Sequence, residues 1–71
     1  MLSVKMETLL CVAEHKNFTR AAEELSLTQP AVSHHIKELE QELGVQLFYT
    51  FGRRQRLTDE GQRLLEGAQR M

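Results

Sequence analysis

The sequence predicts a mainly α-helical fold, with three helices around one small core, a β-hairpin and a further helix at the C-terminal end. Three observations predict this fold class. Apolar residues recur at helical spacing in separate segments, and capping residues stand at the ends of these segments. A stretch containing glycine separates two short segments that can pair as strands. With 71 residues, the chain supports one domain at most, because a chain of this size buries only about 60% of its unfolded surface.

The first two helices are predicted to be short. The first runs from Ser3, which can serve as its N-cap, to about residue 15. Its apolar residues at helical spacing are Met6, Leu9, Leu10 and Ala13. The second helix is predicted over residues 20–25, and either Asn17 or Thr19 can cap it.

The third helix has the clearest boundaries in the chain. Thr28 is a good N-cap, Pro30 falls in the first turn where its missing N–H costs nothing, and Gly44 stands where a left-handed C-cap is expected. Four apolar residues fall within an arc of about 60° on the helical wheel and predict the inward face. They are Val32, Ile36, Leu39 and Leu43.

The remaining chain predicts a hairpin and a last helix. Residues 45–48 alternate as a strand should, residues 49–54 contain Gly52 and predict a turn, and residues 55–57 can return as the second strand. Thr58 is expected to cap the final helix, which we expect to be cut short because the chain stops without a C-cap. One side of this helix carries Leu64, Leu65, Ala68 and Met71.

Two helices joined by a short turn at residues 26–28 and followed by a hairpin predict a winged helix-turn-helix. In this motif the second helix is held by its inner face while its outer face enters the DNA major groove. The outer face of the third helix is predicted to carry Gln29, Pro30, Ser33, His34, Lys37 and Gln41. This strip contains no carboxylate, because Glu38 and Glu42 fall on one flank of the wheel and Glu40 falls on the other.

The distribution of charge along the chain also favours DNA binding, although the net charge does not. The formal net charge is −1 and the pI about 6.3, which argues against a domain that is basic overall. However, Arg53, Arg54 and Arg56 gather in the predicted hairpin, where they suit phosphate neutralisation or a narrow minor groove. Near-neutral charge leaves one alternative open, a winged helix that serves as a protein-interaction module without specific DNA binding.

Several segments in register resemble the DNA-binding domain of LysR-type transcriptional regulators, and the resemblance covers nearly the whole chain. The matching segments are FTRAAEEL (18–25), TQPAVS (28–33), IKELE (36–40), LGVQLF (43–48) and GRRQRLTDEG (52–61). The resemblance implies a dimeric, bacterial, ligand-responsive transcription factor that reads an interrupted dyad in double-stranded DNA. It also implies that a small-molecule effector binds only in a larger C-terminal domain, which we expect to be absent from these residues.

The resemblance divides the chain into a winged helix-turn-helix domain at residues 1–57 and a linker helix at 58–71. The helix-turn-helix would span about 18–37 and the wing about 45–57, with the recognition helix in the major groove and the wing in the minor groove. The predicted DNA-binding residues are Thr19, Arg20, Thr28, Gln29, Pro30, Ser33, His34, Lys37, Arg53 and Arg54. The linker helix would pair two subunits through Leu64, Leu65, Ala68 and Met71.

Three residues depart from the family pattern. His34 stands where the family commonly has arginine, and a histidine cannot offer guanine the bidentate guanidinium fork, so base preference there is left open. Thr50 also replaces a common arginine, so we expect its phosphate contact to be weakened or lost. Lys37 in place of arginine is a milder change.

Other classes of function have little support in the sequence. No arrangement of nucleophile and base and no glycine-rich phosphate loop predicts an enzyme or a cofactor. No metal site is predicted, because the neighbouring His34 and His35 point about 100° apart on a helix and no other Cys or His offers ligand spacing. Cys11 is expected to be a small packing residue, and His15 and His35 surface or flank residues. A single cysteine and the lack of a long apolar run predict a cytoplasmic protein without a membrane span.

Overall fold

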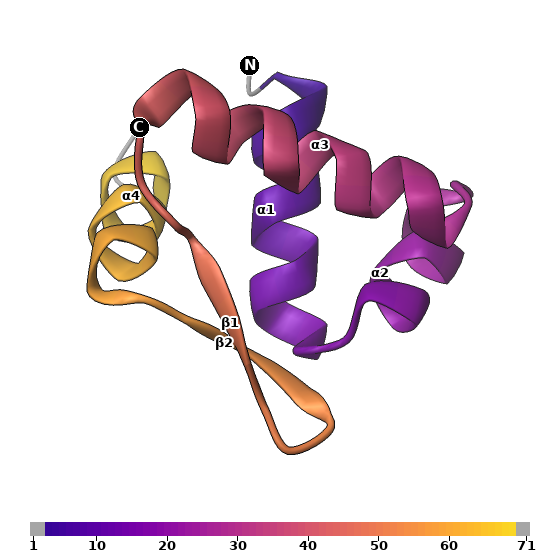
Figure 1. Cartoon of the computed structure of the whole chain (residues 1–71). Coiled ribbons are helices and arrows are strands. Elements are labelled where there is room, and N and C mark those ends of the chain that lie inside the picture. Colours follow the sequence, from indigo (N-terminus) through magenta and orange to yellow (C-terminus); the bar gives the residue numbers. More distant parts are fainter. Residues whose placement is uncertain (1–2, 70–71) are drawn as a thin grey trace.

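Four helices and one antiparallel hairpin make up the residues that the computed structural model describes, 3–69 (Figure 1). The elements are α1 (Val4–His15), α2 (Phe18–Leu25), α3 (Gln29–Leu43), β1 (Phe48–Phe51), β2 (Arg54–Leu57) and α4 (Asp59–Gln69). Helix α3 crosses over α1, α2 lies beside one end of α3, and the hairpin projects from the other end (Figure 1). This arrangement confirms the predicted winged helix-turn-helix with a C-terminal helix.

Side-chain caps begin the three core helices where the sequence predicted them. Ser3 Oγ accepts a hydrogen bond from the Met6 N–H at 3.2 Å, and Thr28 Oγ1 accepts one from the Ala31 N–H at 3.3 Å. Asn17 rather than Thr19 caps α2, so this helix begins at Phe18 and not at residue 20 as predicted. Each cap satisfies a backbone N–H that has no partner within its helix.

Left-handed residues end the same helices and shape the turn between α2 and α3. Gly44 ends α3 with a φ of 69°, as predicted. Lys16 and Ser26 adopt φ angles of 57° and 58° without being glycine. The Ser26 conformation lets the Leu27 N–H reach back to the Ala22 carbonyl at 2.9 Å, which closes α2 and redirects the chain into α3.

The core lies where α1, α2, α3 and the start of β1 meet. It consists of Leu9, Cys11, Val12, Ala21, Ala22, Val32, Ile36, Leu39, Leu47 and Phe48. Leu43, predicted on the inward face of α3, is 48% exposed, so this prediction is wrong. The reason is its position: Leu43 is the last residue of α3, one turn past Leu39, which is the last residue of this helix in the core.

The first strand lies further along the chain than predicted, and the second begins one residue earlier, at Arg54. Residues 45–47 are not a strand, and Tyr49–Phe51, predicted to belong to the turn, pair with β2 instead. The register sets Phe48 opposite Leu57 and Phe51 opposite Arg54, so the tight turn is Gly52 and Arg53, with Gly52 at a φ of 65°. The alternation that predicted an earlier strand arises from burial, because Leu47 is fully buried where the chain passes from α3 to the wing.

Leu47 joins α3, the wing and α4. Its N–H donates to Glu40 Oε2 at 2.7 Å, and its carbonyl accepts the Thr58 N–H at 2.9 Å. Thr58 caps α4 as predicted, because its Oγ1 accepts from the Gly61 N–H at 3.0 Å. Gly61 packs directly against the Leu47 backbone. Both sides of the hairpin are therefore tied to the end of α3.

We predict that Gly61→Ala destabilises the fold. A Cβ at this position would overlap the Leu47 carbonyl oxygen and lie 2.9 Å from Leu57 Cδ2. Overpacking of this kind costs about 1–3 kcal/mol, measurable as a lower free energy of unfolding in urea. Gly67→Ala is the matched control, because its Cβ would meet no atom within 4 Å and helix propensity favours alanine by up to about 1 kcal/mol. Equal losses in both variants would contradict the packing at the junction.

We also predict that Glu40→Ala weakens the fold more than Glu42→Ala does. The first substitution leaves the N–H of the buried Leu47 without its acceptor, which costs about 1–3 kcal/mol. The second removes a surface ion pair with Lys5, which solvent screening makes a much smaller contribution. Urea unfolding followed by circular dichroism compares the two, and Glu40→Gln, which keeps a carbonyl acceptor, should recover most of the loss. A Glu42→Ala loss as large as the Glu40→Ala loss would contradict this role.

Candidate nucleic-acid interface

The outer face of α3 is open to solvent, as predicted. Because Val32, Ile36 and Leu39 are buried on one side of α3, the opposite side of this helix faces solvent. Its exposed residues are Thr28, Gln29, Pro30, His34, Lys37 and Gln41, and Ser33 beside them is half-buried. This strip offers hydroxyl, amide, imidazole and ammonium groups, which are the groups that read base edges and hold phosphates.

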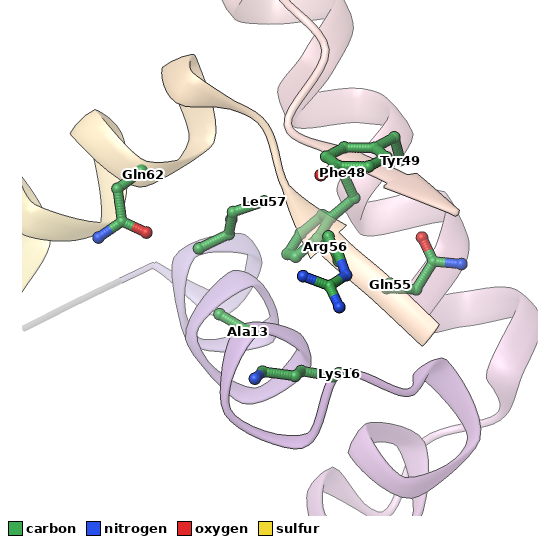
Figure 2. Close-up of a pocket in the computed structure, with 8 residues that line it drawn as sticks. All are labelled: Ala13, Lys16, Phe48, Tyr49, Gln55, Arg56, Leu57 and Gln62. Carbon is green, nitrogen blue, oxygen red and sulfur yellow. The ribbon is translucent and has the colours of Figure 1, made fainter. Parts of the chain in front are cut away.

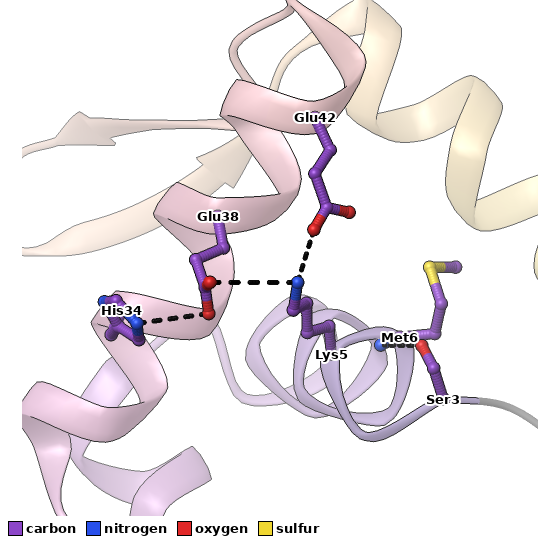
Figure 3. Close-up of polar contacts among 6 residues, drawn as sticks. All are labelled: Ser3, Lys5, Met6, His34, Glu38 and Glu42. Atoms are coloured by element: carbon purple, nitrogen blue, oxygen red, sulfur yellow. Dashed lines mark hydrogen bonds and ion pairs between the residues drawn. The ribbon is translucent and has the colours of Figure 1, made fainter.

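A carboxylate does reach this strip, contrary to the predicted acid-free face. Glu38 Oε1 lies 3.1 Å from His34 Nε2, one turn apart on α3 (Figure 3). Lys5 of α1 lies 3.9 Å from the other oxygen of Glu38 and also pairs with Glu42, whose hydrogen bond raises the pKa of Lys5 (Figure 3). Lys5 thus partly neutralises both acids on the side of α3 that faces α1. The Glu38 carboxylate nevertheless brings negative charge to the exposed strip beside His34.

The start of α2 and the tip of the wing come together at one polar hollow. The hollow is lined by Glu14, His15, Lys16, Asn17, Arg20, Arg53 and Arg54. The Gln55 N–H donates to the Lys16 carbonyl at 3.0 Å, which holds β2 against the end of α1. Arg20, Arg53 and Arg54, three of the predicted DNA-binding residues, therefore share one cationic surface. Thr19 lies exposed at the start of α2.

The third arginine of the hairpin packs on the hairpin itself. The Arg56 guanidinium carbon lies 4.8 Å from the centre of the Phe51 ring, within the range of a cation–π interaction. Arg56 also borders a second hollow between α1, the wing and α4, which Figure 2 shows with its lining residues. The floor of this hollow is formed by Ala13, Phe48 and Leu57, and Lys16, Gln55 and Gln62 stand around it. No carboxylate lines it, so it offers no acid–base pair.

A polar cluster between α1 and α2 was missed in the sequence. The thiol of Cys11, which is 5% exposed, donates to Glu24 Oε2 at 2.8 Å, and His15 Nε2 lies 3.2 Å from Glu24 Oε1. Burial, with a further contribution from Glu24, raises the pKa of Cys11 to about 12, so the thiol is protonated at neutral pH. The hydrogen bond from the Cys11 thiol, and then the nearby His15 imidazole, lower the pKa of Glu24. The spacing of Cys11 and His15, one helical turn apart, was the signal available in the sequence.

The ground for predicting no metal site, that no Cys or His besides His34 and His35 offers ligand spacing, is therefore wrong. The packing of Cys11 is as expected, but the structure brings three metal-ligating side chains together around it, with Glu24 supplied from another helix. His35 is half-buried, which fits the predicted surface or flank position, and its Nδ1 lies 2.9 Å from Thr8 Oγ1.

The residues predicted to pair subunits are only partly described. Leu64 packs against the core of its own chain, and Leu65 borders a hollow with Leu10, Ala13 and Glu14. The side chain of Ala68 and the whole of Met71 lie outside the described part of the structure. Among the described helices, none combines the length and apolar character that crossing a membrane requires.

Residues 4–62 match the family described as "Bacterial regulatory helix-turn-helix protein, lysR family". The chain is 53% identical over 60 residues to the transcriptional regulator DsdC of Escherichia coli, covering 84% of this chain and 19% of DsdC. It is 50% identical over 66 residues to the uncharacterized regulator YxjO of Bacillus subtilis, covering 93% of this chain and 23% of YxjO. It thus spans about a fifth of the length of these curated relatives.

Solved structures agree with the sequence matches. A LysR-family transcriptional regulator from Eggerthella lenta superposes with a TM-score of 0.85 at 49% identity, covering 100% of both chains. The DNA-binding domain of CbnR, in complex with DNA, superposes with a TM-score of 0.90 at 34% identity, covering 99% of this chain and 80% of that one. With the family match extending from α1 into α4, the chain belongs to the LysR family of bacterial helix-turn-helix regulatory proteins.

Proposed function

We propose that this chain is the sequence-specific DNA-binding domain of a dimeric bacterial transcriptional regulator. Helix α3 would enter the major groove and the wing would enter the adjoining minor groove. The observation that carries the proposal is the pairing of two surfaces: the exposed polar strip of α3, and the cationic hollow that α2 and the wing tip share. The likeness to the DNA-bound CbnR domain supports it.

The proposed contacts divide by chemistry. Thr28, Gln29, Pro30 and Ser33 at the start of α3 would read base edges and nearby phosphates, with His34 and Lys37 one turn further on. Arg53 and Arg54 would reach the minor groove, while Thr19 and Arg20 at the start of α2 would hold the backbone. His34 would approach DNA with Glu38 beside it, which reduces the benefit of a positive charge at this position.

These contacts suggest a separate role for each of two segments of the chain. Residues 1–57 would form the DNA-reading unit, and residues 58–71 a linker helix that pairs two subunits across an interrupted dyad. The effector would bind elsewhere in the whole regulator. We propose that these residues bind DNA and do not catalyse a reaction. Because the ligand would be bacterial DNA, the domain would act in the cytoplasm.

A winged helix that binds another protein is the second candidate. The net charge of −1 and the exposed aromatic side chains of the wing favour it, since Phe51 is 62% and Tyr49 43% exposed. The two candidates differ in their response to salt, because binding to DNA phosphates releases counterions and protein binding does so far less.

We predict that two contact variants lose DNA affinity in different ways. Affinity is measured for a duplex selected from a random pool and for random DNA. Ser33→Ala should weaken binding to the selected duplex by roughly fivefold, the value of one hydrogen bond. Arg53→Ala should weaken binding to both duplexes and lower the slope of log affinity against log salt by about 1. Arg63→Ala on α4, which lies away from the wing tip (Figure 1), removes the same charge as a control.

Unchanged affinity in both contact variants would contradict the assignment of these residues. A wild-type affinity that does not respond to salt would favour the protein-interaction alternative.

We further predict that Leu65→Gln weakens the dimer. Leu65 is half-buried and borders an open hollow, whereas Leu64 packs into the core of its own chain, so Leu65 is the better probe of an intersubunit contact. Sedimentation equilibrium should show a larger dissociation constant for Leu65→Gln, with Gln62→Ala on the exposed face of α4 as the control. A monomeric wild-type chain, or equal dimerisation in all three proteins, would contradict pairing through this helix.

A further inference from the structure

The cluster of Cys11, His15 and Glu24 has the composition of a metal site. Cys11 and His15 stand one turn apart on α1, and Glu24 reaches them from α2. One ligand atom from each side chain, a sulfur, a nitrogen and an oxygen, lies within 4.8 Å of the other two. None of the three is among the proposed DNA contacts, although His15 also lines the hollow that Arg20, Arg53 and Arg54 share. Nothing in DNA recognition requires a thiol, an imidazole and a carboxylate together.

Two of the three donor pairs are spaced nearly as in a tetrahedral site. Ligand bonds of about 2.0–2.3 Å place neighbouring donors roughly 3.4 Å apart around zinc. In this structure Glu24 oxygens lie 2.8 Å from the Cys11 sulfur and 3.2 Å from His15 Nε2. The Glu24 side chain is 53% exposed, so its carboxylate can move outwards by the small distance that a central ion needs. Its exposure also gives the ion a path of entry.

One atom of the cluster lacks a hydrogen bond. His15 Nε2 is buried and has no hydrogen-bond partner among the described residues, although the Glu24 carboxylate is near. A buried ring nitrogen without a partner is costly, and coordination of a cation by its lone pair would satisfy it. The same cation would hold the Glu24 carboxylate in place.

The donor set selects the kind of ion. A thiolate and an imidazole favour zinc and related borderline-soft ions, whereas magnesium and calcium prefer oxygen ligands throughout. Three protein ligands leave a fourth tetrahedral position for water.

We propose that Cys11, His15 and Glu24 bind one zinc-like divalent cation that clamps α2 to α1. On binding, the thiol proton of Cys11 leaves to solvent and the thiolate sulfur takes a coordination position. Because α2 is the first helix of the helix-turn-helix, the cation would stabilise the unit that orients α3.

Titration of the full chain with Co²⁺, followed by Zn²⁺ competition, tests the proposal under a reductant that contains no thiol. We expect one Co²⁺ per chain, a thiolate-to-cobalt charge-transfer absorption, displacement by Zn²⁺, and a higher Tm with Zn²⁺. His15→Gln and Glu24→Gln should each weaken binding by more than about 10-fold. Cys11→Ser should abolish the charge-transfer absorption.

His34→Gln is the matched control, because His34 is also one turn from a glutamate but has no thiol beside it. We expect its Co²⁺ affinity to equal that of the wild type. Circular dichroism without metal checks that each variant is folded. If Cys11→Ser is not folded, His15→Gln and Glu24→Gln, at the partly exposed ligands, decide the outcome. A wild type without charge-transfer absorption, or unchanged affinity in both His15→Gln and Glu24→Gln, would overturn the proposal. Neither result bears on DNA binding, which the Arg53→Ala titration tests separately.

Discussion

The placement of the wing relative to α3 depends on the buried residue Leu47. Its side chain fills the core, its N–H is held by the carboxylate of Glu40 on α3, and its carbonyl is held by Thr58 at the start of α4. Gly61 lets α4 approach this backbone closely. Because both ends of the hairpin are anchored to the end of α3, the cationic wing tip keeps a set position relative to the recognition helix. A DNA reader that uses two grooves requires that relation.

The acidic residues explain how a domain with a net charge of −1 presents a cationic surface. Glu40 accepts backbone hydrogen bonds at the wing, and Glu24 accepts the thiol of Cys11. Glu38 and Glu42 pair with Lys5. These carboxylates act as acceptors within the fold, while Arg53, Arg54 and the face of α3 remain open. The position of charge, rather than its sum, therefore governs what this surface can bind.

Helix α1 is the scaffold to which the other elements attach. Its Lys5 holds the α3 flank, the carbonyl of Lys16 at its C-cap accepts from β2, and Cys11 contacts Glu24 of α2. These contacts lie on different sides of one helix, so α1 fixes both helices of the helix-turn-helix and the wing. A cation at the α1–α2 contact would add to the apolar packing of Ala21 and Ala22 in the core that α1 and α2 share.

By itself the sequence determined the helices and the outward face of α3. Caps such as Thr28 and Gly44 act within one helical turn, and Val32, Ile36 and Leu39 reveal the buried face through a local period. Tertiary structure decided what depends on distant segments. The alternation around Leu47 reflects burial rather than a strand, and Leu43 is exposed because the core ends at Leu39, one turn before it. The Cys11–Glu24 contact joins residues 13 apart, and only the packing of α2 against α1 creates it.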